Sequence, residues 1–133
     1  MRLRFDEREL SLLRGAEQVR GASLAHNPRP EVLRSALALA RTGHKLAHAA
    51  PRVTVSLEEP EVRLLIEALR FAIHEVHWVG DQSHADEVAA AADRRATVLR
   101  SFPELTERGL WRTFGVCREL DALGSRLQRA VSS

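Results

Sequence analysis

The segment Leu3–Val19 recurs in altered form 52 residues further along the chain, as Val55–Phe71. Five aligned positions are identical, namely Glu7/Glu59, Glu9/Glu61, Leu12/Leu64, Leu13/Leu65 and Ala16/Ala68. A duplicated unit of this size does not usually bury its apolar face alone and packs against its twin. The duplication therefore predicts two similar units, at about residues 2–50 and 54–102, in one domain spanning residues 1–133.

Each copy has the pattern of a short strand followed by a helix with an acidic start. Alternating side chains in Arg2–Phe5 and Val53–Leu57 predict two strands, which would pair antiparallel if a twofold axis relates the copies. Asp6 and Glu9 have the spacing of a capping box at a helix start. Helical periodicity and proline breaks predict helices at about residues 6–25, 30–50, 56–79, 85–102 and 107–130.

The predicted fold class is all-α, a five-helix bundle built from two repeated helical hairpins plus a long C-terminal helix, with a short two-stranded β-ribbon. The third helix has two apolar stripes, which predicts a central position. The stripes are Val62, Leu65, Ile66, Leu69, Ile73 and Val76, and Leu64, Ala68, Phe71 and Trp78. The C-terminal helix, at about residues 104–131, has no counterpart in the duplication. It is predicted to be either a brace across both copies or a dimerisation helix.

Length and composition fit a globular domain. Of the 133 residues, 44% are apolar and 29% are charged, which argues against global disorder. The single cysteine cannot form an internal disulfide, which suits a reducing compartment. No stretch is apolar enough for a secretory signal or a membrane span. We therefore expect a cytoplasmic protein with no membrane partner.

The net charge of +2 hides two regions of opposite sign. Residues 1–52 contain ten basic and five acidic side chains, whereas residues 53–105 contain five and ten. Opposite charges favour contact between the copies or between chains. Nucleic acid binding through basic residues of the first copy is an alternative. The small number of aromatic residues and the lack of a recognisable nucleic-acid module argue against it. Its candidate ligands are Arg2, Arg4, Arg8, Arg14, Arg20, Arg29, Arg34, Arg41, Lys45 and Arg52.

Two histidine pairs are the candidate metal ligands. His44 and His48 are four residues apart and His74 and His77 are three apart, so each pair can share a helix face. A transition-metal site would require both pairs to converge on one point. His74 and His77 continue the polar stripe of their helix, which argues against such convergence. The line that contains His44 also contains Leu37, Ala40 and Ala47. We expect solvated histidines and no cofactor, with a metal-binding bundle as the alternative.

Glu75 and Cys117 are the other residues with chemical potential. Glu75 lies on an apolar stripe, where an unpaired carboxylate would be costly, so we expect Arg94 or Arg95 to pair with it. The alternative is a general base with a raised pKa, but no convergent set of residues supports one. Cys117 lies on an apolar stripe of the last helix and is expected in the core. No catalytic residue is predicted.

By elimination, the sequence predicts a non-enzymatic helical protein-interaction or structural module that self-associates or binds another protein. The candidate contact residues are Leu110, Trp111 and Phe114, near the start of the last helix. The alternative for these three residues is that they only close the core of the monomer.

Overall fold

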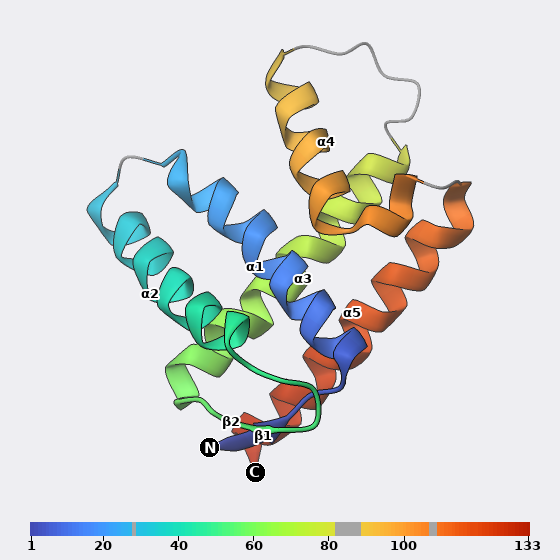
Figure 1. Cartoon of the computed structure of the whole chain (residues 1–133). Helices are drawn as coiled ribbons and strands as arrows, with labels where there is room; N and C mark the ends of the chain where they lie inside the picture. Colours follow the sequence, from blue (N-terminus) through green and yellow to red (C-terminus); the bar gives the residue numbers. More distant parts are fainter. Residues whose placement is uncertain (28, 82–88, 107–108) are drawn as a thin grey trace.

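The structure, a computed structural model, describes the backbone of residues 1–27, 29–81, 89–106 and 109–133, and all side chains in these ranges except those of 89–91 and 109–111. The described residues form five α-helices and a two-stranded antiparallel sheet, which confirms the predicted all-α bundle with a short ribbon (Figure 1). The elements are β1 (Arg2–Arg4), α1 (Glu7–Ala25), α2 (Pro30–Ala47), β2 (Thr54–Ser56), α3 (Glu59–Asp81), α4 (Ala89–Ser101), a 3-10 turn (Pro103–Thr106) and α5 (Gly109–Ser132). Within the described ranges, no helix combines the length and apolarity that crossing a membrane requires.

The ribbon joins the starts of the two aligned segments. Leu3 lies opposite Val55, with one further residue pair on each side. Leu3 and Val55 are also the residues that the alignment of the copies equates, so a local twofold relation between the strands passes through this pair. The ribbon therefore holds the start of α1 close to the start of α3.

Both of these helices begin with acidic side chains that accept backbone N–H groups. In α1, the Glu9 N–H donates to Asp6 Oδ1 at 2.7 Å and the Asp6 N–H donates to Glu9 Oε1 at 3.0 Å. At the start of α3, the Glu58 N–H donates to Glu61 Oε1 at 2.9 Å. These contacts satisfy donors that a helix start leaves free. The capping box predicted at Asp6 and Glu9 is confirmed.

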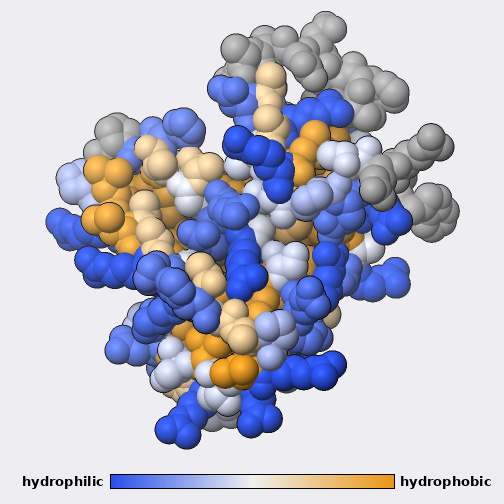
Figure 2. Space-filling view, in the orientation of Figure 1, coloured by the Kyte–Doolittle hydropathy of each residue, from blue (hydrophilic) through white to orange (hydrophobic). Residues whose placement is uncertain are grey.

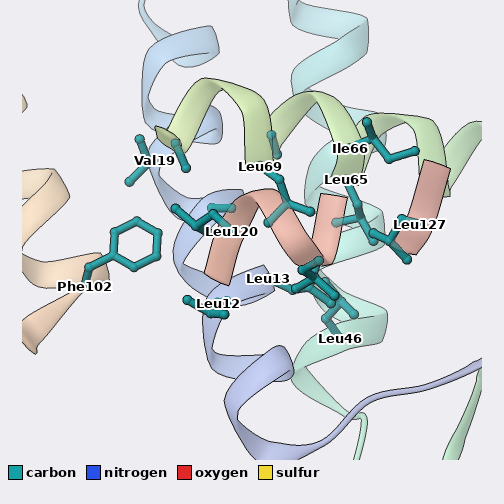
Figure 3. Packing of buried hydrophobic residues seen from close by; sticks show 14 of the residues in the cluster. Leu12, Leu13, Val19, Leu46, Leu65, Ile66, Leu69, Phe102, Leu120 and Leu127 are labelled. Atoms are coloured by element: carbon teal, nitrogen blue, oxygen red, sulfur yellow. The ribbon is translucent and has the colours of Figure 1, made fainter. Parts of the chain in front are cut away.

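Helix α3 is central and contacts all four other helices. Helix α1 packs between α2 and α3, and α5 runs along α3 (Figure 1). Helix α4 packs more extensively on α1 than on α3, so the second hairpin is more open than the first. Figure 3 shows the shared core, with side chains from four helices and from the residue after α4: Leu12, Leu13, Val19, Leu46, Leu65, Ile66, Leu69, Leu120, Leu127 and Phe102.

Ion pairs join the basic and acidic regions of the chain. Three of them connect residues 1–52 with residues 53–105: Arg20–Glu67 at 2.7 Å, Lys45–Glu61 at 2.8 Å and Arg8–Glu104 at 2.6 Å. At least three basic side chains of residues 1–52 are therefore paired with acidic side chains of residues 53–105 within one chain.

Helix α5 braces the bundle from one side. Its buried side chains are Val116, Cys117, Leu120, Leu123 and Leu127. Near its C-terminal end, Arg126 donates to the Glu9 carboxylate and to the Arg4 carbonyl, and its guanidinium lies 5.4 Å from the centre of the Phe5 ring. Helix α5 thus ties the ribbon and α1 to α3.

Candidate functional site

A line of mainly apolar side chains lies on the outer side of α2. We call it the outer α2 face, and it consists of Leu33, Leu37, Ala40, His44 and Ala47, all of them exposed. Leu33 is 43% exposed and Leu37 is 60% exposed. Figure 2 shows apolar atoms on the surface over α2, at the left edge of the view. Intervals of four and three residues place the line on one side of the helix, as in the seam between paired helices.

The opposite side of α2 is used by the fold. Leu39, Thr42 and Leu46 are buried there. The guanidinium of Arg14 donates to the Leu46 carbonyl at 2.8 Å and to the Ala49 carbonyl at 3.1 Å, which satisfies acceptors that a helix end leaves free. Helix α2 is therefore apolar on two sides, and only one of them meets the core.

A basic row borders the outer α2 face. It consists of Arg34, Arg41 and His48, which are exposed and seven residues apart. Residues at this spacing lie nearly above one another on a helix. The apolar line and the basic row are therefore neighbouring, nearly parallel features of α2.

The histidines lie at two places on the surface. His44 and His48 are in contact, with ring centres 4.5 Å apart and ring planes at 77°. On α3, His74 and His77 are exposed, and the His77 ring lies 6.4 Å from the Phe114 ring of α5. No group of three or more His, Cys, Asp or Glu side chains in the described part of the chain has the arrangement of a metal site. Any metal held by His44 and His48 would need further ligands from elsewhere.

The contact residues predicted near the start of α5 are only partly described. Phe114 is 50% exposed. The side chains of Leu110 and Trp111 lie outside the described residues. Gly115 is exposed, and a Cβ added to it would meet no described atom within 4 Å outside its chain neighbours and its own helix backbone. Phe114 and Gly115 are therefore both exposed in the described part of α5.

A pocket of about 490 Å³ lies between α1, α3 and α4, and Glu75 and Arg94 form part of its wall. Glu75 is 6% exposed. Its Oε1 accepts from Arg94 Nε at 2.9 Å, and its Oε2 accepts from Arg94 Nη2. The Arg94 guanidinium lies 3.9 Å from the centre of the Trp78 ring, and its hydrogen bond with Glu75 raises the pKa of Arg94. The predicted pairing of Glu75 is confirmed, with Arg94 as partner.

Several of the basic residues considered for nucleic acid have partners inside the chain. Arg8 bonds to Glu104 and Glu119, which together raise the pKa of Arg8. Arg20 pairs with Glu67. The guanidinium of Arg14 is held at the end of α2. These contacts reduce the positive charge that the first copy can offer to phosphate groups.

Cys117 is buried in α5, as predicted. Its Sγ lies 3.8 Å from the Ile73 carbonyl, to which it donates. Burial raises the pKa of the Cys117 thiol to about 11. Since the thiolate is the reactive form, this cysteine has low reactivity as a nucleophile at neutral pH.

The outer α2 face has a signal in the sequence, although no interaction surface is predicted there. The line through Leu37, Ala40, His44 and Ala47 bears on metal binding through His44, and it also marks an apolar side of the helix. Leu33 extends this line by one turn, and Leu39 and Leu46 form a second apolar side. The second apolar side that predicts a central position for the third helix therefore has a counterpart in the second helix.

Comparison of the chain with protein-family models, curated proteins and solved structures gives no significant match.

Proposed function

We propose that this chain is a non-enzymatic helical protein-interaction module whose contact surface is the outer α2 face. The observation that carries the proposal is the exposure of Leu33 and Leu37 on a helix whose other side is already packed in the core. Covering apolar surface is favourable by about 25 cal/mol per Å². A helix docked over these leucines would gain this contribution, which the described part of the fold leaves unused.

The arrangement of the exposed residues supports the proposal more than their exposure alone. One exposed leucine is ordinary on a protein surface. Here, residues 33 to 47 continue one apolar line over roughly 21 Å of helix, at 1.5 Å per residue. Such a line fits the side of another helix, because helices pack through residues at intervals of three and four.

Binding of a designed helical peptide tests this function. The probe has leucines at intervals of three and four residues and glutamine at the flanking positions, and fluorescence anisotropy measures its affinity. We expect saturable binding to the wild type. For the double variant Leu33→Ser/Leu37→Ser, we expect an affinity lower by about tenfold or more, which corresponds to about 1.4 kcal/mol of binding free energy. Val53→Ser is the matched control, since Val53 is 55% exposed and lies outside α2. Equal affinity of the wild type and the double variant would contradict the proposal.

Self-association is a second candidate function, and the exposed Phe114 on α5 favours it. We propose that two copies of the chain meet through this end of α5. The ring of Phe114 supplies apolar area, and the exposed Gly115, which has no side chain, allows close approach of another helix.

Sedimentation velocity over a range of concentrations tests self-association. We expect the sedimentation coefficient to rise with concentration for the wild type and for Leu33→Ser/Leu37→Ser, but not for Phe114→Ser. A monomer at every concentration up to about 1 mM, a range that includes weak complexes, would refute self-association. That result would leave the peptide-binding proposal intact.

A further inference from the structure

We propose that the outer α2 face binds an acidic amphipathic helix, meaning a helix of another protein whose apolar stripe is bordered by Asp and Glu. This inference rests on the function proposed above and adds the charge of the partner. It follows from the basic row, Arg34, Arg41 and His48, which runs beside the apolar line.

The two arginines of the basic row are not used by the fold. Neither Arg34 nor Arg41 makes an ion pair or a side-chain hydrogen bond with any residue that the structure describes. By contrast, Arg14 and Arg20 of α1 are both engaged inside the chain. Helix α2 has one acidic residue, Glu31, and it lies in the first turn. The edge of the outer α2 face is therefore positively charged and solvated.

The position of the basic row determines what it can contact. If a helix covers Leu33 and Leu37, the residues flanking its own apolar stripe come next to Arg34 and Arg41. These positions correspond to the flanking positions of a coiled coil, where charge decides which partner is accepted. Acidic flanks would pair with the arginines, and basic flanks would be repelled.

The same geometry argues against a second copy of this chain as the partner at α2. In an antiparallel pair of α2 helices related by a twofold axis, each flank meets the same flank of the other helix. Arg34 and Arg41 of one copy would face the arginines of the other, and like charges across a contact oppose association. A partner with the opposite charge removes this conflict.

A phosphate-bearing partner would use only half of the surface. Nucleic acid could contact Arg34 and Arg41, but it would leave Leu33 and Leu37 in water. An interfacial membrane helix requires a large apolar side, often with aromatic residues. The outer α2 face instead has alanine at positions 40 and 47 and no Phe or Trp. An amphipathic helix is the partner that uses both the leucines and the arginines.

Three probe peptides with the same leucine stripe, but with Glu, Gln or Lys at the flanking positions, test the inference. We expect the Glu peptide to bind about tenfold more tightly than the Lys peptide, with the Gln peptide between them. This difference should shrink between about 0.1 M and about 1 M salt, where the screening length falls from about 10 Å to about 3 Å.

Charge variants locate the effect on the basic row. In Arg34→Gln/Arg41→Gln, we expect the Glu and Lys peptides to bind with nearly equal affinity. The matched control, Arg112→Gln/Arg118→Gln, removes two exposed arginines from α5, away from α2 (Figure 1), and should keep the wild-type preference.

The outcomes separate this inference from the function on which it rests. Equal binding of the Glu and Lys peptides to the wild type would overturn the acidic partner and leave the interaction module standing. No binding of any of the three peptides would overturn both. Binding to phosphatidylserine vesicles or duplex DNA that requires Arg34 and Arg41 but survives Leu33→Ser/Leu37→Ser would also overturn the inference, because it would show a phosphate ligand instead.

Discussion

Helices α2 and α3 have similar apolar patterns but different surroundings. In α3, Leu65 and Leu69 are buried on one side, and Leu64 and Phe71 on the other side are partly buried against the core. In α2 one side is buried, whereas Leu37 on the other side is 60% exposed. The difference arises from position, since α3 contacts all four other helices and α2 lies at the edge against α1 (Figure 1). A second apolar side on a helix therefore indicates a surface to be covered, and the neighbours decide whether the same chain covers it.

The comparison predicts its largest difference for leucine truncation. Leu69→Ala in α3 removes a side chain with no exposed surface and should lower the free energy of unfolding by about 2–5 kcal/mol, through lost burial and a cavity. Leu37→Ala in α2 should change it by about 0.5 kcal/mol or less. Urea denaturation measures both. A similar loss for the two variants would show that Leu37 is covered in the folded protein, and the distinction between the helices would fail.

Substitutions of charged residues should show a smaller difference in the free energy of unfolding between the surroundings of α3 and those of α2. Arg94→Ala leaves the carboxylate of Glu75 without its partner in the interior and should cost about 2–3 kcal/mol in the free energy of unfolding. Arg34→Ala on α2 should cost about 0.5 kcal/mol or less, because Arg34 has no partner within the described chain. Urea denaturation at neutral pH measures both variants.

Arg94→Lys is the control that distinguishes pairing from packing. A lysine retains the positive charge but cannot form the two-pronged contact with the carboxylate, so it should recover only part of the lost stability. Full stability in Arg94→Ala would mean that solvent reaches Glu75 and replaces the arginine, and α3 would then resemble α2 in this respect.

The smallest expected effect is a pH dependence at the contact between α1 and α2. Glu17 packs against Gly43, where an added Cβ would lie 2.6 Å from Glu17 Cδ. Burial raises the pKa of Glu17. The ionised carboxylate is thus disfavoured in the folded state, so stability falls as the pH rises from the ordinary carboxyl pKa through the raised pKa of the folded state. Below the ordinary carboxyl pKa of about 4.3, both states are protonated and this effect vanishes.

We therefore expect Glu17→Gln to raise the free energy of unfolding at neutral pH and to have little effect below about pH 4. Urea denaturation at the two pH values provides the comparison. A gain of the same size at both pH values would assign the effect to shape rather than charge. That outcome would also show that the charge of Glu17, at the contact between α1 and α2, does not lower the free energy of unfolding.

Local features of this fold could be predicted because they depend on residues close together in the chain. The capping box at Asp6 and Glu9 and the start of α2 at Pro30 require no knowledge of distant contacts. The pairing of Leu3 with Val55 follows from the duplication and an assumed twofold relation. For Glu75, the requirement was energetic, since a carboxylate on an apolar stripe needs a cation.

Other features depend on contacts between distant segments, which periodicity does not specify. The sequence shows that α2 has two apolar sides, but it does not show which of them meets α1. For the same reason it did not predict that α4 packs more on α1 than on α3. The end of α2 also differs from expectation, at Ala47 rather than about Ala50. Phe114 is exposed at the predicted contact on α5, whereas the histidine pairs of α2 and α3 form no common cluster among the described residues.

The contact of Arg14 with the end of α2 has a consequence for the kinetics of docking. Because this guanidinium is bonded to the Leu46 and Ala49 carbonyls, the C-terminal turn of α2 is held in place before any partner arrives. A docking helix would then meet a preorganised surface, and the backbone of α2 would lose little entropy on binding. Association would proceed at the ordinary rate of rigid-body encounters, and differences in affinity among partners would be expressed mainly in their dissociation rates.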